Sequence, residues 1–485
     1  PCLEIKGHIS NNSKFSKSGI NKTVITRKQI EESGAIDLID ILKSSPDINI
    51  TQSGPKGQQA SIFMRGTGSN HTLVMINGIP INDQSTTQGL HDFGVDFLQT
   101  VQQIEVYPGS SATLFGTNAI GGAINIILTG DYQDSYSVAL DKDKNYELYG
   151  NKSYLYDNSS LNFKFGSIRH ETISVRGSSD AEKDKLINYT TNINYENYLS
   201  FDKRFFNNLY LRQTIAEYDN SNTNQSGYEG DNKMANVQIG LEKSSQFSNN
   251  KYILYYNVYN RDYDERGTID SYESEVVGLK YDLSKTINSK TSFGGGVDYR
   301  YDWGYFDNNG TYQATTKGHS ENLSIYGNIG LNLFENLNTS FFGRNDNHKH
   351  TGNNITYQMN LDQSIGQSNL GFSYMKGLRN PTLYELFGTD NFGYSGNRNL
   401  KAEKSNTYEL YTKLKINNFT NLHVRGFRSN IKNNIEYINN KYRNDTDNVD
   451  LNQSGINTTL LLNSNNYDFK LFSSLLSSKK ENNSD

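Results

Sequence analysis

The strongest constraint on the fold is an alternation of apolar and polar residues that recurs from residue 131 to the end of the chain. In LSIYGNIGLNLF, Leu323, Ile325 and Ile329 share one face, while Ser324 and Asn328 share the other. Successive side chains of a β-strand point to opposite sides, so such segments predict strands with one apolar and one polar face. Segments of about ten residues, joined by short and long polar connections in turn, are typical of an outer-membrane β-barrel.

The composition agrees with strands that face lipid on one side and water on the other. Only 34% of the 485 residues are hydrophobic, yet 12% are aromatic and 34 are Tyr. Disordered chains are poor in aromatic residues, and the strands of a soluble β-sandwich are shorter and more apolar. No apolar run reaches the 18 residues of a transmembrane helix. With a net charge of -5 and no basic cluster, nucleic acid is not an expected partner.

Residues 21–130 follow a different pattern, which predicts a small α+β domain. VITRKQIEES indicates a strand and then a helix that Thr26 and Gln29 begin with a capping box. AIDLIDILKSSP indicates a second helix, ended by Pro46, and ASIFMRG, TLVMINGIPI and VQQIEVY indicate short strands. The glycines of SSATLFGTNAIGGAINIIL favour a place where several backbones cross closely.

The strand count predicts an incomplete barrel in residues 131–485. These residues hold 17 or 18 candidate strands, and the chain ends in the polar stretch SSKKENNSD. Plugged outer-membrane transporters have about 22 strands. We therefore expect the last strands to be missing and a gap to separate the first strand from the last.

Several stretches resemble those of the TonB-dependent outer-membrane receptors: DILKSSPDINI, SIFMRGTGSNHTLVMINGIPI, QQIEVYPGSSATLFGTNAIGGAINII, LRNPTLYELFG and GNRNLKAEKSNTYEL. The resemblance implies a 22-stranded antiparallel transmembrane barrel with the N-terminal α+β domain inside its lumen as a plug. It implies a location in the outer membrane of a Gram-negative bacterium and TonB as a partner on the periplasmic side.

The implied activity is active uptake of a scarce nutrient. Within the family, VITRKQI, DINITQSG and GTNAIGGAINII most resemble the cobalamin receptors, so cobalamin or a related corrinoid is the expected ligand. The alternatives are a ferric-siderophore or haem receptor and, more distantly, a passive porin or an adhesin. The eight His are scattered and no catalytic motif is present, so an enzyme is not expected.

The resemblance places the ligand on two plug loops, residues 51–60 and 81–94. Their amides and hydroxyls suit a neutral, amide-rimmed ligand, and no cluster of Arg and Lys suggests an anionic one. The candidate ligand contacts are Gln52, Ser53, Gln58, Gln59, Asn82 and Asp83. The alternative is that these are ordinary polar turn residues.

The family also holds its plug by contacts between plug arginines and barrel glutamates. Arg65 matches one such arginine, and Glu403 and Glu409 match the glutamates. Where the family usually has Arg-Gly-Pro, this chain has Pro108-Gly109-Ser110 after Tyr107, so one arginine is absent. We expect Arg65 to contact one glutamate, and the other to bind backbone amides, a lysine or water.

Two further sites follow from the resemblance. The segment that pairs with TonB, together with its linker, occupies residues 1–20, and the TonB box itself is assigned to Leu3, Glu4, Ile5, Lys6, Gly7, His8 and Ile9. No cofactor is required, but calcium in the outer loops is a candidate, with ligands Asp180, Asp184, Asp219 and Asp231. These four aspartates do not form an EF-hand pattern.

Overall fold

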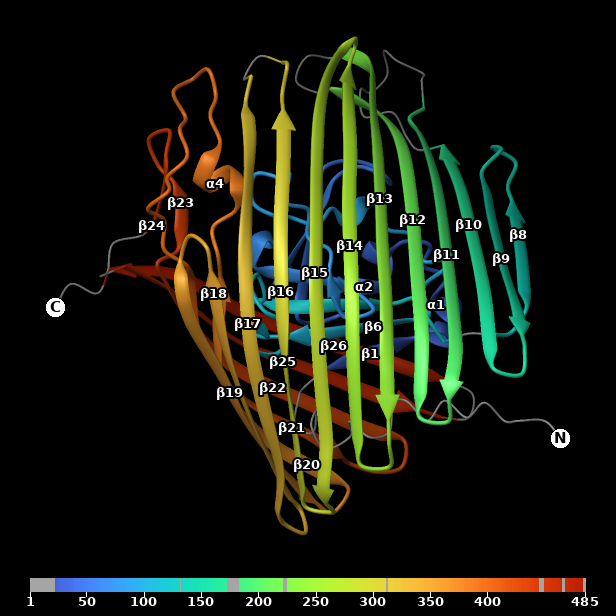
Figure 1. Cartoon of the computed structure of the whole chain (residues 1–485), viewed down its shortest axis with the longest axis vertical. Coiled ribbons are helices and arrows are strands. Elements are labelled where there is room, and N and C mark those ends of the chain that lie inside the picture. The colour runs from blue at the N-terminus through green and yellow to red at the C-terminus, as the bar shows by residue number, and fades with distance from the viewer. Residues whose placement is uncertain are drawn as a thin grey trace.

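Long antiparallel strands surround a small N-terminal domain in the computed structural model (Figure 1). The structure describes residues 22–130, 132–171, 183–220, 225–310, 313–444, 449–464 and 467–482. No helix in these ranges has the length and apolar character needed to cross a membrane.

The N-terminal domain, called the plug below, contains one five-stranded sheet of order β1-β6-β7-β4-β5 and a hairpin of β2 and β3. Its helices are α1 (Arg27–Ser33), α2 (Leu38–Leu42), α3 (Ala112–Phe115), η1 (Ser69–His71) and η2 (Phe93–Val95). Its strands are β1 (Thr23–Thr26), β2 (Ile48–Gln52), β3 (Ala60–Met64), β4 (Thr72–Ile76), β5 (Ile79–Pro80), β6 (Gln103–Pro108) and β7 (Gly122–Ile127).

Local sequence signals account for the plug elements. The Thr26 side chain accepts from the Gln29 backbone N–H and the Gln29 side chain caps Thr26, so the expected capping box begins α1. At Gly121, an added Cβ would lie 2.2 Å from Thr67 Oγ1, and at Gly122 it would lie 2.5 Å from the Tyr107 carbonyl oxygen. The GlyGly pair therefore admits β7 between β4 and β6, as the glycine-rich run predicted.

In the described ranges, seventeen strands form the barrel wall. They are β8 (Ser135–Leu140), β9 (Tyr146–Leu155), β10 (Ser159–Glu171), β11 (Lys185–Ser200), β12 (Lys203–Asn220), β13 (Gln225–Ser244), β14 (Ser248–Glu265), β15 (Thr268–Asn288), β16 (Thr291–Asp307), β17 (Thr315–Phe334), β18 (Leu337–His348), β19 (Gly352–Ile365), β20 (Ser368–Arg379), β21 (Glu403–Lys415), β22 (Thr420–Lys432), β25 (Val449–Asn463) and β26 (Asp468–Asn482). A helix, α4 (Leu383–Phe387), and a hairpin, β23 (Ile435–Tyr437) with β24 (Tyr442–Asn444), lie in two connections of the wall.

The wall alternates as the sequence predicted. In β17, Leu323 and Ile325 are 42% and 57% exposed on the outer face, whereas Ser324 between them is fully buried toward the lumen. At one end of the barrel, successive strands are joined by two to four residues, and at the other lie the longer connections that carry α4 and the β23–β24 hairpin. We call these the short-turn end and the long-loop end.

The ring is closed, so the expectation of a gap is wrong. The closing neighbours are β26 and β8. The other neighbouring pairs are antiparallel, and with an odd number of strands β8 and β26 therefore run in the same direction. Closure is favourable because an open edge in lipid would leave backbone N–H and C=O groups unpaired. All side chains of β8 are exposed, as are the described ones of β26.

The plug lies inside the ring, as expected (Figure 1). Lumen-facing side chains of the wall donate to its backbone: Gln238 to the Ile76 carbonyl at 2.9 Å, Asn257 to that of Pro80 at 2.8 Å, and Tyr259 to that of Ile81 at 2.6 Å. Wall residues Tyr210, Met234 and Tyr259 also join the main hydrophobic core of the plug. The polar face of the barrel thus supplies partners for a domain that fills its lumen.

Candidate functional site

A buried cluster of four charges holds the hairpin of β2 and β3 to the wall. Arg65 Nη2 donates to Glu409 Oε2 on β21, and Arg65 Nε donates to Asp47 Oδ1 at 3.1 Å. Asp47 also accepts from Arg425 Nη1 on β22 at 2.6 Å and from Asn457 Nδ2 on β25 at 2.7 Å. Arg65 therefore does contact one of the two glutamates.

The cluster is balanced, with two arginines and two carboxylates. Burial by itself raises the pKa of the Asp47 carboxyl, but the Arg425 and Arg65 guanidiniums outweigh it and hold that pKa below its usual range. Arg65 has a φ of 52°, an uncommon left-handed conformation for a residue with a side chain. Its guanidinium also lies over the Phe427 ring, 4.6 Å from the centroid.

Glu403 is paired by a wall arginine and a plug histidine, which differs from the expectation. Arg379 Nε donates to Glu403 Oε2 at 2.6 Å, and His71 Nε2 lies 2.6 Å from the same oxygen. The backbone N–H of Ile435 donates to Glu403 Oε1 at 2.6 Å, so the expected backbone contact is present. Arg379 from β20 thus takes the place of the absent plug arginine.

Arg379 also reaches the long-loop end. Its Nη1 and Nη2 donate to the two oxygens of Glu385 on α4, both at 3.1 Å, and Arg379, Glu385 and Glu403 are all fully buried. We call Glu385, Arg379, Glu403 and His71 the Arg379 junction. It connects α4, the β23 strand and the plug in one chain of contacts.

Two further contacts bind the plug to the other side of the ring. Asp83 pairs with Arg261 Nε of β14 at 2.8 Å and accepts from Ser274 Oγ of β15 at 2.7 Å. Asp96 accepts from Arg212 of β12 and lies 2.5 Å from His91 Nε2. Strands β12–β15 and β20–β22 are far apart in the ring order. The plug is therefore held from two sides.

The 51–60 loop leaves four candidate ligand contacts accessible. Ser53 and Gln59 are exposed, and Gln52 and Gln58 are half-buried. Gln58 Nε2 donates to the Glu217 carbonyl near the end of β12, which places this loop toward the long-loop end. These neutral amides and hydroxyls can bind a ligand that enters from that end.

Ligand contact by Asn82 and Asp83 stays a prediction, and the structure places both side chains within the fold. Asn82 is buried, its amide donates to the carbonyls of Thr72 and Gly89, and its oxygen accepts from the Val74 N–H. Asp83 is occupied by the ion pair with Arg261. Both side chains are used within the fold, since buried polar groups need internal partners.

The only cation of the 51–60 loop is neutralised. Lys56 Nζ lies 2.5 Å from Asp37 Oδ2 and 2.5 Å from Asp40 Oδ2. Burial lowers the pKa of Lys56, but hydrogen bonds and attraction from these two carboxylates outweigh that effect and raise it. The amine is thus charged but already paired, so it offers little to an anionic ligand.

An aromatic cluster at the long-loop end was not predicted. It consists of Tyr272, Phe306, Tyr384, Tyr394, Tyr437 and Tyr442. Tyr272 stacks on Phe306 with ring centroids 4.4 Å apart, and Tyr384 stacks on Tyr394 at 4.8 Å. Tyr437 is 52% exposed. The sequence signal was present, since Tyr384 lies in LRNPTLYELFG, but nothing in the sequence joins residues of four separate segments.

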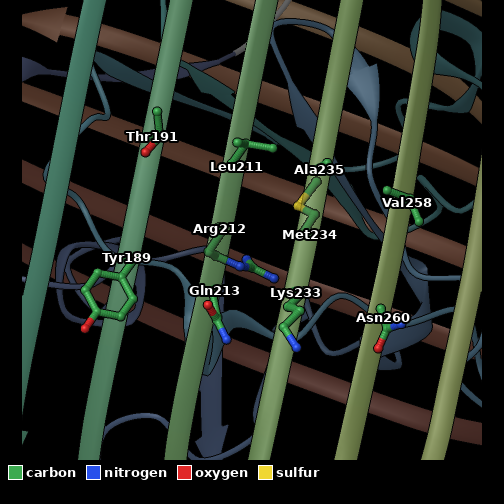
Figure 2. A pocket seen from close by; sticks show the side chains of 10 residues that line it. All are labelled: Tyr189, Thr191, Leu211, Arg212, Gln213, Lys233, Met234, Ala235, Val258 and Asn260. Atoms are coloured by element: carbon green, nitrogen blue, oxygen red, sulfur yellow. The ribbon is translucent and has the colours of Figure 1, made fainter.

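A hollow of about 340 Å³ on β11–β14 is a different feature (Figure 2). Figure 2 shows the residues that line it, which all come from the wall and include Leu211, Lys233 and Val258. Arg212 in the same lining turns to the lumen and binds Asp96 of the plug. No plug residue lines the hollow, and we do not include it in the candidate site.

The calcium and TonB-box predictions stay predictions. Leu3 to Ile9, Asp180 and the side chain of Asp219 lie outside the described residues. Asp184 is buried, and Asp231 pairs with Lys233 at 2.6 Å and accepts from Gln213 at 3.0 Å. Within the described ranges, no group of three or more His, Cys, Asp or Glu is arranged to hold a metal ion.

A ring of alternating strands with an apolar outer face, filled by a domain that buried ion pairs hold in place, defines the class of plugged β-barrels. The chain belongs to the TonB-dependent receptor family. Residues 15–123 match the TonB-dependent receptor plug domain, and residues 131–483 match the TonB-dependent receptor-like β-barrel.

Named relatives fall into two groups. The Vitamin B12 transporter BtuB of Vibrio cholerae serotype O1 is 26% identical over 411 residues, or 82% of this chain, and this chain spans 65% of that relative's length. The structure of the siderophore receptor PirA from Acinetobacter baumannii is similar, with a TM-score of 0.77 at 17% identity. The match covers 93% of this chain and 79% of the PirA chain. The ferric-catecholate import receptor Fiu from E. coli K12 has a TM-score of 0.78 at 15% identity, and the match covers 97% of this chain and 81% of the Fiu chain. The two structural likenesses establish the fold alone.

Proposed function

We propose that the protein is a TonB-dependent active transporter of a Gram-negative outer membrane that takes up cobalamin or a related corrinoid. The observation that carries the choice of ligand is the 51–60 loop. It presents Ser53 and Gln59 to the long-loop end, and its single cation, Lys56, is neutralised by Asp37 and Asp40. A neutral ligand rimmed by amides finds hydrogen-bonding partners there, whereas an anion finds no free charge on this loop.

The proposed transport mechanism depends on how the plug is held inside the barrel. Ligand bound at the long-loop end contacts plug loops, and the proposed TonB box, Leu3 to Ile9, precedes the plug in the sequence. Binding outside and release of the box inside are then coupled, and such coupling is reciprocal. A passive porin is disfavoured because the plug fills the lumen and is held there by buried ion pairs.

A ferric-siderophore or haem receptor is the second candidate. The aromatic cluster favours it, since Tyr437 is 52% exposed and can offer its ring to a planar aromatic ligand, with the buried Tyr394 packed behind it. The two similar structures given above are named a siderophore receptor and a ferric-catecholate import receptor. Charge separates the two candidates: a ferric catecholate is anionic, and the 51–60 loop has no unpaired cation.

Direct binding tests the proposal. The full chain in detergent is titrated with cyanocobalamin, a ferric catecholate siderophore and haemin. We expect saturable binding of cyanocobalamin alone, weakened by Gln59→Ala and unchanged by Gln363→Ala at the opposite end of the barrel. Tight binding of the siderophore or haemin without cyanocobalamin binding would select the second candidate.

Energy coupling has a separate test. Deletion of residues 3–9 should leave ligand binding intact and abolish ligand accumulation in cells that contain TonB. Accumulation that persists after this deletion would place the TonB box elsewhere or make transport passive.

A further inference from the structure

A cavity of about 300 Å³ lies between the plug and the wall, away from the ligand loops. Its plug side is formed by the first residues of β1 and by the segment after α2, including Ser44 and Ser45. Its wall side is formed by β21, β22, β25 and β26. Thr412 and His423 of the lining flank the short turn between β21 and β22, so the cavity lies at the short-turn end.

The lining is strongly basic. The wall contributes Lys413, His423, Arg425 and Lys470, and the plug contributes Lys22. Asp47 is the one acidic residue of the lining, and it already accepts hydrogen bonds from two arginines and an asparagine. Charges of one sign along a cleft with low-dielectric walls focus the electrostatic potential and attract counter-ions.

Several of these side chains have N–H groups that can make a further hydrogen bond. Lys470 Nζ uses one of its three hydrogens on the Ser44 carbonyl, at 2.9 Å. Arg425 is already paired with Asp47 and Glu409, although its buried Nε makes no hydrogen bond to the described residues. Within those residues, neither Lys413 nor His423 has a carboxylate at ion-pair distance. Lys22 is paired with Glu105, at 2.5 Å.

We propose that this cavity binds a small oxyanion through its phosphate or carboxylate groups. The ammonium groups of Lys413 and Lys470 supply charge, while the hydroxyls of Ser45 and Thr459 lie in the same lining and can add neutral hydrogen bonds. The volume lies at the lower end of small-molecule sites, which suits an anion of modest size. The site is at the opposite end from the proposed ligand loops and does not depend on the proposed function.

Titration of the full chain in detergent at low ionic strength tests the proposal, with inorganic phosphate and citrate as probes. The variant Lys413→Gln/Lys470→Gln removes two cavity charges. Its matched control, Lys28→Gln/Lys243→Gln, removes two charges from side chains that are 81% and 58% exposed. We expect the cavity variant to weaken probe binding at least about tenfold, or 1.4 kcal/mol, and the control to leave it within about twofold.

The outcomes separate the alternatives. Absence of saturable binding by both probes, or equal loss in the control, would overturn the proposal, because the attraction would then be diffuse. Dihexanoyl phosphatidylglycerol forms a third arm: binding of this lipid that depends on Lys413 and Lys470 assigns the oxyanion to a headgroup, and binding of phosphate or citrate assigns it to a free anion. None of these probes requires TonB or an external ligand, so failure here leaves the transport proposal untouched.

Discussion

At the scale of single residues, charge placement decides how the plug is held. The sequence led to Arg65 and Glu409, which do meet, because the resemblance supplied both partners. It did not identify Asp47, because no feature of the sequence indicates that this carboxylate before β2 contacts Arg425, 378 positions away. It did not show that Asn82 binds the backbone of its own fold, because a polar loop residue looks the same in the sequence whether it faces a ligand or that backbone.

Arg65→Met should loosen the plug without unfolding the barrel. It leaves Glu409 buried with a weaker partner, Arg425 Nε at 3.8 Å, and breaking a buried pair in this way costs about 3–5 kcal/mol. Hydrogen exchange of the β3 and β6 amides measures the effect, and fluorescence of the single Trp, Trp303 in β16, reports the barrel.

The matched control for this variant is Lys28→Met. Lys28 pairs with Glu32 at 3.6 Å on an exposed helix face, where an ion pair contributes about 0–1 kcal/mol. Plug exchange in Arg65→Met equal to that in Lys28→Met would show that the buried cluster does not hold the plug.

The Asp47 carboxyl makes the attachment of the plug to the wall sensitive to low pH. Its pKa is lower in the folded protein than in the unfolded chain, where it is about 3.9. Its stabilising contribution is therefore fully present above that value and is lost as the pH falls toward the folded pKa. We expect plug amide exchange, corrected for its intrinsic pH dependence, to rise below about pH 4 in the wild type. In Asp47→Asn the rise should be smaller and start from a faster baseline, and identical profiles would contradict this role.

At the scale of elements, local signals predicted most of the structure. The capping box of α1, the plug strands and the alternation of the wall all depend on residues close together in the chain, so the sequence carries them. The closure of the ring does not, because it depends on β26 meeting β8, more than 300 residues apart. The aromatic cluster at the long-loop end was missed for the same reason.

Gly122→Ala should disturb the packing of β7 between β4 and β6. The new Cβ would lie 2.5 Å from the Tyr107 carbonyl and 2.7 Å from Met64 Cε, at a φ of 154°. Overpacking of this kind typically costs about 1–3 kcal/mol, so exchange of the β4 and β6 amides should rise accordingly. Gly426→Ala is the control, because nothing lies within 4 Å of its added Cβ. Similar exchange in both variants would mean that the close crossing at β7 does not constrain the plug.

At the scale of the whole molecule, the Arg379 junction joins the loop end to the plug. Glu385 lies on α4, next to Tyr384 of the aromatic cluster, and His71 belongs to the plug. Between them Arg379 binds two carboxylates, with Nε and Nη2 on Glu403 and Nη1 and Nη2 on Glu385. A change in the position of α4 thus acts on the same guanidinium that binds Glu403, the partner of His71, which provides a physical link between the long-loop end and the plug.

Arg379→Lys tests that link, because lysine keeps the charge but cannot bind two carboxylates in a planar fork. If the junction couples ligand binding to the plug, affinity at the loop end should stay within about threefold while the uptake rate falls about 5- to 150-fold, the usual range for a coupling of 1–3 kcal/mol. Arg300→Lys is the matched control, since Arg300 is also a wall arginine, with its side chain 12% exposed, but it pairs with Asp302 of its own strand, at 2.5 Å. Loss of binding and uptake in equal measure would reduce the junction to a structural support, and an equal fall in uptake in Arg300→Lys would show that another wall arginine matters as much.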